Sequence, residues 1–375
     1  MAAQFAHVEA NLVFAHEAGI AMSATYIYAI IPTRSQVAFE AAGLDDDQEE
    51  VYTLAQGDLA AVVSASPLAD YRGLKRDEAV RYLIAHQRVV EEAMRAFPVL
   101  PLRFGTVLPN KEWVRRFLRE GSLLFHASLQ KIMGMVQMEV VVLCKLPAIF
   151  QEIAQEETIA RLKAELAALP AEKTTAGRIA LGQMVQHALT QRRTTLRDRL
   201  LPRLQEGALD AVSNPLMDDS MVLNIALLLD EKGRQALEKR LEVLDAEYGG
   251  QLTFRCVGPL PPYSFATIEV QKPTYEAIDE ARRQLGLGEM ASLEEIKHAY
   301  RQLAAQLHPD HNQQDAQAET RMAALTQAYR LLTVYAESQT ARGGMPTATC
   351  SLGRQAVEQS LLIAIRRQES NLTGF

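Results

Sequence analysis

Two amphipathic helix patterns on either side of a short polar segment constrain the fold near the C-terminus more than any other feature. Apolar residues recur three and four positions apart, at Leu293, Ile296, Tyr300, Leu303 and Leu307 before the segment and at Ala318, Met322, Leu325, Tyr329 and Leu332 after it. This spacing places them on one face of each helix, which predicts an antiparallel helical hairpin. Ser292 and Glu295 have the spacing of a capping box at the start of the first helix. Pro309 is expected to end that helix, because the residue before a proline is disfavoured in the α region.

The predicted hairpin presents His308, Pro309 and Asp310 at its tip. Segments on both sides complete a pattern: Leu285-Gly286-Leu287, Ser292 to Lys297, Ala299-Tyr300-Arg301, Leu303-Ala304 and Gln327 to Leu332. With them, residues 275–335 resemble the J-domain, the part of DnaJ-type co-chaperones that engages DnaK-type ATPases. The resemblance implies that the tripeptide binds a DnaK-type chaperone, together with Lys297 and Arg301 of the preceding helix. Asp310 would offer an acceptor to a partner arginine and His308 a switchable donor.

Several positions depart from the usual J-domain pattern. Gln302 and Gln306 stand where basic residues are usual, His311 replaces a lysine, and Leu307 replaces a tyrosine. Because the attraction to an acidic partner depends on a basic face, we expect weak or specialised coupling. Taken alone, the tripeptide is also compatible with an ordinary turn. A metal site is not expected, since the spacing around the proline is too tight and no second cluster exists.

The composition is that of an ordinary globular protein. The chain has 375 residues, 48% hydrophobic and 23% charged, which suggests about two or three domains. A net charge of −7 argues against a general nucleic-acid binder. Three widely separated cysteines fit a reducing cytoplasm. No apolar run approaches the ~20 residues of a membrane span, and residues 1–22 are expected to form a loosely attached extension without the features of a signal peptide.

The N-terminal part alternates between strand and helix patterns. Strands are expected at 25–31, 51–54, 59–64, 99–108 and 138–146, with helices at 37–42, 77–97 and 113–131. This order predicts a ferredoxin-like α+β domain over residues 23–147, with its helices on one face of the sheet.

The middle of the chain predicts a second α+β domain over residues 148–270. Charged helical patterns up to about residue 206 predict a helical hairpin or coiled coil, followed by a strand at 221–229, a helix at 231–248 and a strand at 252–257. Residues 271–273 read as a linker to the all-α J-domain hairpin at 275–335. Residues 336–375 are expected to form a C-terminal tail with an amphipathic helix at 357–366.

Four stretches of the larger part are distinctive in combination. They are Tyr26-Ile27-Tyr28-Ala29-Ile30, His86-x-x-Val89-x-Glu91, Val99 to Thr106 (VLPLRFGT) and Val257 to Phe265 (VGPLPPYSF). With them, about residues 24–270 resemble the GvpL/GvpF family of gas vesicle proteins. The resemblance implies a minor accessory or assembly component with a modified ferredoxin-like domain, then an α+β domain with coiled-coil helices. It supplies no catalytic residues and no cofactor.

Polar and aromatic residues within these stretches have two interpretations each. His86 is expected to be a hydrogen-bonded core histidine, with partner binding as the alternative. Arg103 is expected to pair with a carboxylate such as Glu91 or to project at a strand end, with a binding role as the alternative. Tyr263 and Phe265 either anchor the core or contact the vesicle shell. Five arginines of one helix are expected to form salt bridges with an acidic neighbouring helix, with an acidic partner as the alternative: Arg192, Arg193, Arg197, Arg199 and Arg203.

Together these patterns predict a gas vesicle accessory or assembly protein, cytoplasmic and associated with gas vesicles. It would bind gas vesicle shell or other accessory proteins, and its J-domain would recruit a DnaK-type chaperone. The alternative is a minor structural component whose J-like hairpin is only a docking module. Enzyme motifs such as G-x-x-x-x-G-K-[ST], G-x-S-x-G and H-E-x-x-H are absent, so we expect no catalysis, cofactor, metal, nucleic acid or membrane partner.

Overall fold

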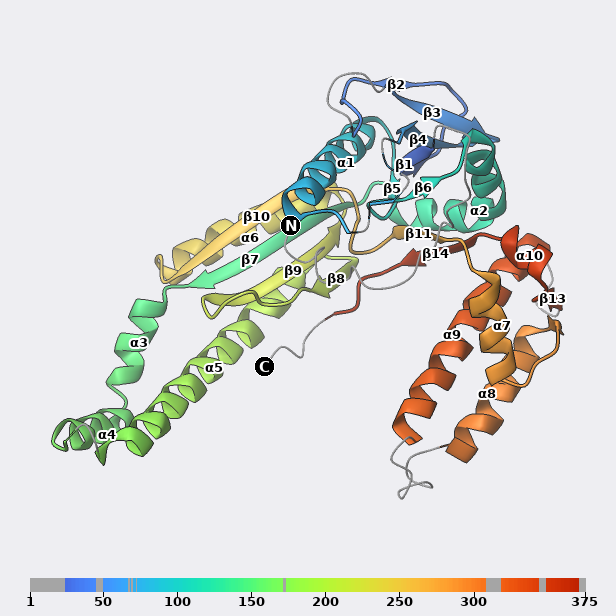
Figure 1. Cartoon of the computed structure of the whole chain (residues 1–375). Helices are drawn as coiled ribbons and strands as arrows, with labels where there is room; N and C mark the ends of the chain where they lie inside the picture. Colours follow the sequence, from blue (N-terminus) through green and yellow to red (C-terminus); the bar gives the residue numbers. More distant parts are fainter. Residues whose placement is uncertain are drawn as a thin grey trace. The chain divides into compact units, whose positions relative to one another are not determined.

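The computed structural model describes residues 24–44, 50–66, 68, 70–71, 73–170, 173–307, 318–343 and 349–370 (Figure 1). The tripeptide His308, Pro309 and Asp310 lies outside these residues. The chain divides into two compact units. Among the described residues, 24–133 and 266–366 form one unit, and 134–265 with 367–370 form the other.

A six-stranded antiparallel sheet forms the centre of the N-terminal region. Its strands are β1 (Thr25–Ile31), β2 (Ala38–Phe39), β3 (Val51–Gln56), β4 (Leu59–Ala65), β5 (Leu100–Pro101) and β6 (Val107–Leu108). They follow the order β2-β3-β4-β1-β5, with β6 also pairing β1. The aromatic and β-branched run of β1 is buried along its whole length, as expected for a central strand.

Two helices cover the two faces of this sheet. Ile27 of β1 packs with apolar residues of α2 (Lys111–Ile132), such as Phe117 and Phe125. Tyr26 and Tyr28 point the other way and contact α1 (Arg76–Ala96). Since neighbouring side chains of a strand alternate between faces, the residues of β1 contribute to both layers.

Two elements differ from the predicted ferredoxin-like order, which is therefore not confirmed. The predicted helix at 37–42 is replaced by the short strand β2, which pairs with β3. The predicted strand at 138–146 is β7 (Val136–Cys144), and it pairs with strands of the other sheet. The first sheet therefore ends before residue 136 and not at the predicted domain limit of 147. The coarser prediction of a mixed fold with antiparallel sheets is confirmed.

The second unit contains a four-stranded antiparallel sheet in the order β10-β7-β9-β8. Besides β7, its strands are β8 (Asp210–Ser213), β9 (Met221–Leu229) and β10 (Leu252–Leu260). Alternate residues of β7 and β9 pack against α5 (Thr175–Gln205) and α6 (Glu231–Tyr248) in one apolar core. The strand, helix and strand predicted from residue 221 onward are thus confirmed.

The predicted helical hairpin of the middle region is confirmed. The helices α3 (Leu146–Ala154) and α4 (Glu157–Ala167) pack against α5 around Ile153, Ile159 and Leu189. Arg192 of α5 forms ion pairs with Glu152 and Glu156, at N–O distances of 2.5 and 2.8 Å. The predicted pairing with an acidic neighbouring helix therefore holds for Arg192, while Arg203 pairs with Glu247 of α6.

The C-terminal region contains α7 (Tyr275–Gln284), α8 (Leu293–Leu307) and α9 (Ala318–Gly343). A shared core includes Ile278, Ile296 and Leu332, one from each helix and all fully buried. The predicted hairpin of α8 and α9 is thus confirmed. Its capping box is confirmed as well, because Ser292 N–H and Oγ–H donate to Glu295 Oε2 and Glu295 N–H donates to Ser292 Oγ.

The residues after α9 differ from the predicted tail. A strand, β13 (Cys350–Ser351), pairs with β12 (Met290–Ala291), and a short helix, α10 (Arg354–Glu358), follows. The predicted helix at 357–366 is wrong beyond residue 358, because Leu362–Arg366 form the strand β14, which pairs with β11 (Thr267–Gln271). Residues 349–366 therefore pack into the folded structure.

Candidate functional site

His86 lies in a buried aromatic cluster between α1 and the sheet. Its side chain is 1% exposed, and its Nδ1 is hydrogen-bonded to the Tyr26 hydroxyl at 2.9 Å. The Tyr28 ring stacks on it at a centroid distance of 5.6 Å, and the Phe104 ring contacts it edge-on. Burial lowers the pKa of His86 to about 3, a shift that the backbone of Leu102 partly offsets. The imidazole is therefore neutral near pH 7, which fits the core interpretation.

The motif from Val99 to Thr106 contributes Phe104 and Gly105 to the same cluster. Gly105 N–H donates to the Tyr26 hydroxyl at 3.0 Å. Gly105 has a φ of +83°, a conformation that costs glycine little and most other residues considerably more. The glycine of this motif thus lets the backbone turn and reach the tyrosine.

Arg103 forms an ion pair, but with a different carboxylate from the predicted one. Its Nη1 lies 3.2 Å from Glu269 Oε1 on β11, and Arg366 of β14 pairs with the other oxygen of the same carboxylate at 3.1 Å. Glu91 instead accepts a hydrogen bond from Gln87 on its own helix. Arg103 therefore links the N-terminal sheet to the strands that flank the C-terminal helices.

Tyr263 and Phe265 differ in how far they are exposed. Phe265 is 9% exposed and packs with Val212 and Leu228 of the second sheet, which favours the core-anchor interpretation. Tyr263 is half-buried. Ser264 between them donates its N–H to the Gln137 side chain at 2.8 Å, so the segment is fixed to the sheet. A partner-binding role for these two aromatic residues stays a prediction.

Lys297 and Arg301 lie on the solvent side of α8. Lys297 pairs with Glu294 at 3.3 Å, and Arg301 Nε donates to the Lys297 carbonyl at 3.2 Å. Behind them, the rings of Tyr300 and Tyr329 stack at 4.2 Å and join α8 to α9. The basic side chains therefore reach solvent, while the stacked tyrosines join the two helices of the hairpin.

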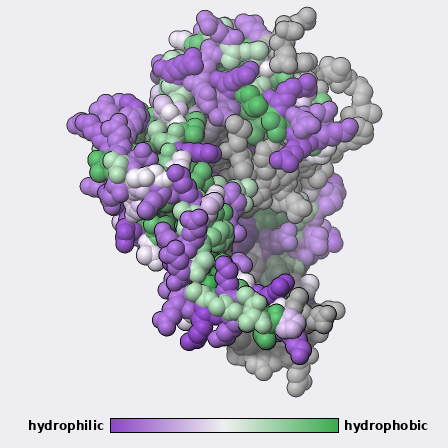
Figure 2. Space-filling view, turned by 90° about the vertical axis from the view of Figure 1, so that its left-hand side faces the viewer, coloured by the Kyte–Doolittle hydropathy of each residue, from purple (hydrophilic) through white to green (hydrophobic). Residues whose placement is uncertain are grey.

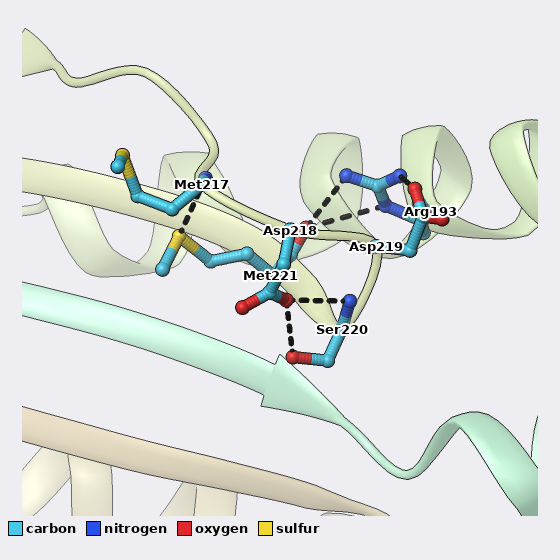
Figure 3. A network of polar contacts seen from close by, with 6 residues as sticks. All are labelled: Arg193, Met217, Asp218, Asp219, Ser220 and Met221. Atoms are coloured by element: carbon cyan, nitrogen blue, oxygen red, sulfur yellow. Dashed lines mark hydrogen bonds and ion pairs between the residues drawn. The ribbon is translucent and has the colours of Figure 1, made fainter.

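A polar network at the start of β9 was not predicted from the sequence (Figure 3). Arg193 is only 5% exposed, and its guanidinium donates to the Met221 carbonyl and to Asp219. Asp218 accepts hydrogen bonds from the N–H and hydroxyl of Ser220, which lower the pKa of its carboxyl group. The sequence marked Arg193 as one of several surface arginines, since its spacing gives no sign of a partner 26 residues further on.

A hollow of about 590 Å³ lies beside the end of β7. It is lined by Cys144, Lys145, Leu146, Pro147, Ala148, Gln151 and Ser220. Burial raises the pKa of the Cys144 thiol, so the sulfur is protonated at neutral pH and a poor nucleophile. Within the described ranges, no group of three or more His, Cys, Asp or Glu residues is placed to hold a metal ion.

Some large apolar side chains are exposed on the surface of the described residues. Figure 2 shows one face of the molecule, where hydrophobic residues lie in small groups among hydrophilic ones. In the helical hairpin, Leu169 is 50% and Ile179 is 59% exposed. Each helix within the described residues is too short or too polar to span a bilayer.

The comparisons with known proteins identify the two parts of the chain. Residues 24–267 match the family described as gas vesicle synthesis protein GvpL/GvpF. The chain belongs to this family. Residues 283–339 match the DnaJ domain, so this GvpL/GvpF protein carries a J-domain in its C-terminal region.

Curated relatives of this GvpL/GvpF protein are themselves gas vesicle proteins. Gas vesicle protein F of Streptomyces sp. is 28% identical over 242 residues, which cover 64% of this chain and 98% of the relative. Gas vesicle protein L1 of Halobacterium salinarum is 27% identical over 271 residues, which cover 67% of this chain and 93% of the relative.

Solved structures support the same fold. The crystal structure of GvpF from Anabaena sp. is similar with a TM-score of 0.55 at 24% identity, over 64% of this chain and 97% of that one. GvpF from Microcystis aeruginosa gives a TM-score of 0.51 at 22% identity, over 64% and 98%. The family match ends at residue 267, where β11 begins. Because the matched region covers 98% and 97% of two GvpF relatives, the J-domain follows an almost complete family body.

Proposed function

We propose that this protein is a gas vesicle assembly factor in the cytoplasm, associated with gas vesicles. Its GvpL/GvpF body would bind shell or other accessory proteins, and its J-domain would recruit a DnaK-type chaperone. The proposal is carried by one observation: a DnaJ domain with its own packed helical core occurs in a chain whose remaining part belongs to a gas vesicle family.

A physical argument supports joining these two activities in one chain. The shell of a gas-filled compartment must present apolar surface, so its subunits are prone to aggregate before they assemble. A body that binds such subunits, joined to a recruiter of a chaperone, raises the concentration of the chaperone around its client.

The test is ATP turnover by the host's DnaK-type chaperone with this protein added. We expect stimulation by the wild type and its loss in His308→Gln, which alters the tripeptide that the J-domain resemblance assigns to the chaperone. His187→Gln is the matched control, because His187 is exposed on α5 in the other unit. Equal stimulation by the His308→Gln variant and the wild type would rule out the recruiter role.

The second candidate is a minor structural component of the vesicle whose J-like hairpin only docks. The reduced basic face of α8 favours it, because Lys297 is paired with Glu294 and Gln302 and Gln306 replace basic residues. On this candidate the protein co-purifies with washed, intact vesicles and stimulates no chaperone. Recovery in the soluble fraction alone would argue against it.

A further inference from the structure

The J-domain lies between two strands that pair with each other. The strand β11 precedes it and β14 follows it, and their register runs from Thr267 opposite Arg366 to Gln271 opposite Leu362. The segment that contains the J-domain therefore leaves and re-enters the fold at one place. A domain appended at a chain end has one connection, whereas this one has two that are hydrogen-bonded to each other.

The paired strands are also joined to the N-terminal sheet. Arg103 N–H donates to the Ile268 carbonyl at 2.9 Å, and Leu102 bridges to Ile268 in parallel. Ile268 and Val270 of β11 are buried in the same apolar core as α2 and β1. Glu269 adds the ion pairs with Arg103 and Arg366. The ladder of β11 and β14 is thus part of the N-terminal core.

The returning segment, residues 349–366, leads from the J-domain back into β14, and two adjacent residues in it belong to different cores. Leu361 is 1% exposed and packs in the core of the N-terminal sheet, whereas Leu362 is 3% exposed and packs in the core of the J-domain. Leu352 and Val357, earlier in the same segment, are fully buried in the J-domain core. The J-domain therefore cannot swing away without uncovering apolar residues of this segment.

The helix α2 holds both connections. Trp113, the single tryptophan of the chain, lies beneath the Arg116 guanidinium at 5.1 Å and the Lys272 ammonium at 5.4 Å. Arg116 also donates to the carbonyl of Gln359, just before β14. Lys272 follows β11 directly and begins the outgoing segment, which leads to the J-domain. Trp113 therefore contacts the outgoing segment, and Arg116 contacts the returning segment.

We propose that the ladder of β11 and β14, together with Trp113 and Arg116, is a mount that fixes the J-domain on the N-terminal domain. The functional part of this inference rests on the proposed chaperone recruitment. A mounted J-domain delivers the chaperone to one place on the GvpL/GvpF body. A J-domain on a flexible tether would sample many positions, which lowers the effective concentration at any one client site.

Hydrogen–deuterium exchange on the full chain tests the mount itself. In the wild type, the amides of β11 and β14 are expected to be protected. Arg116→Ala removes the hydrogen bond to Gln359, the cation–π contact with Trp113 and an ion pair with Glu120 on the same helix. We expect about tenfold faster exchange of residues 362–366. The control is Arg115→Ala, because the Arg115 side chain pairs with Glu112 on the same helix. This substitution should change the exchange rate of residues 362–366 by less than about twofold. Unprotected strands in the wild type, or equal exchange in both variants, would overturn the mount.

The fluorescence of Trp113 independently tests its contact with Lys272. Because it is the single tryptophan, its fluorescence reports only this junction. Lys272→Ala is expected to shift its emission and increase its access to a neutral quencher. An emission spectrum and quenching that match the wild type would contradict the contact with the outgoing segment.

The functional consequence is tested by lengthening both connections. About ten Gly/Ser residues are inserted after Lys272 and after Ser360, which frees the J-domain but leaves β11 and β14 intact. The control carries the same insertion at Gly249-Gly250, the turn that ends α6. We expect chaperone stimulation within about twofold of the wild type but a several-fold lower yield of gas vesicles.

The outcomes separate this inference from the proposed function. A normal vesicle yield from the lengthened variant would overturn the role of the mount, even with stimulation intact. If the wild type itself stimulates no chaperone, the proposed function fails, while the exchange experiment still decides whether the mount exists. Should lengthening damage the J-domain, Arg116→Ala combined with Lys272→Ala loosens the mount at constant chain length and is expected to lower the yield in the same direction.

Discussion

In the N-terminal domain, His86 is enclosed by aromatic rings, whereas Lys297 of the J-domain lies on the surface of α8. His86 is 1% exposed, is hydrogen-bonded to Tyr26 and has a pKa lowered to about 3. Lys297 is 37% exposed, and its ammonium group pairs with Glu294, one turn earlier on the same helix. Both residues belong to recognisable sequence motifs, yet only the side chain of Lys297 is exposed to solvent.

The difference shows that a motif can be specific for structure or for binding. Tyr26, His86 and Gly105 come from three separate motif stretches and meet in one hydrogen-bonded cluster. Their joint occurrence is therefore explained by the packing of a family fold. The polar contacts described for the Lys297 and Arg301 side chains are with residues of their own helix, so they do not join separate parts of the fold as those of His86 do.

The largest expected contrast is in stability. His86→Ala removes a buried ring and leaves the Tyr26 hydroxyl without its histidine partner, so we expect the free energy of unfolding to fall by about 3 kcal/mol. Lys297→Ala should change it by less than about 0.5 kcal/mol. Urea unfolding followed by circular dichroism measures both. A similar loss in the two variants would break the contrast.

Local patterns were sufficient to predict the J-domain hairpin. The spacing of Ile296, Tyr300 and Leu303 matches the face that packs in the core, and Ser292 and Glu295 form the capping box as predicted. These features depend on neighbours one turn apart along the chain. The same holds for β1, whose composition alone marks a buried strand.

Features that depend on distant partners were not predictable in the same way. The sequence of β7 indicates a strand, but its neighbours β9 and β10 lie much later in the chain. Arg103 meets Glu269, 166 residues away, while Glu91 was the nearer carboxylate. Residues 362–366 have a pattern compatible with a helix, and pairing with β11 makes them a strand.

The second prediction uses acid to sharpen the contrast. The pKa of His86 is about 3 in the folded state against an ordinary 6.5, so the unfolded chain binds the proton more tightly. Above about pH 6.5 the titration of His86 therefore does not reduce the free energy of unfolding. As the pH falls from 6.5 toward 3, its contribution lowers the free energy of unfolding by about 1.4 kcal/mol per pH unit.

Comparison with His86→Gln isolates this contribution from the titration of carboxylates. We expect the wild type to lose stability more steeply than the variant between about pH 6 and pH 4.5, as measured by urea unfolding at each pH. Parallel curves would mean that His86 is protonated in the folded state and that the cluster is less tightly closed than its burial indicates.

The smallest effect on stability, and the most informative for function, is expected on α8. Lys297→Ala combined with Arg301→Ala should leave the unfolding free energy within about 1 kcal/mol. If α8 faces an acidic chaperone surface, stimulation of its ATPase should fall several-fold at low salt, and the deficit should shrink at high salt because the attraction is screened.

The matched control is Arg161→Ala combined with Lys163→Ala on α4, which removes the same two charges from the other unit. An equal deficit in both double variants would assign the effect to net charge and not to a surface of the J-domain. Unchanged stimulation in both would mean that α8 does not carry the chaperone contact. Neither Lys297 and Arg301 nor His86 would then indicate a binding surface. The two motif regions would differ only in how deeply these side chains are buried.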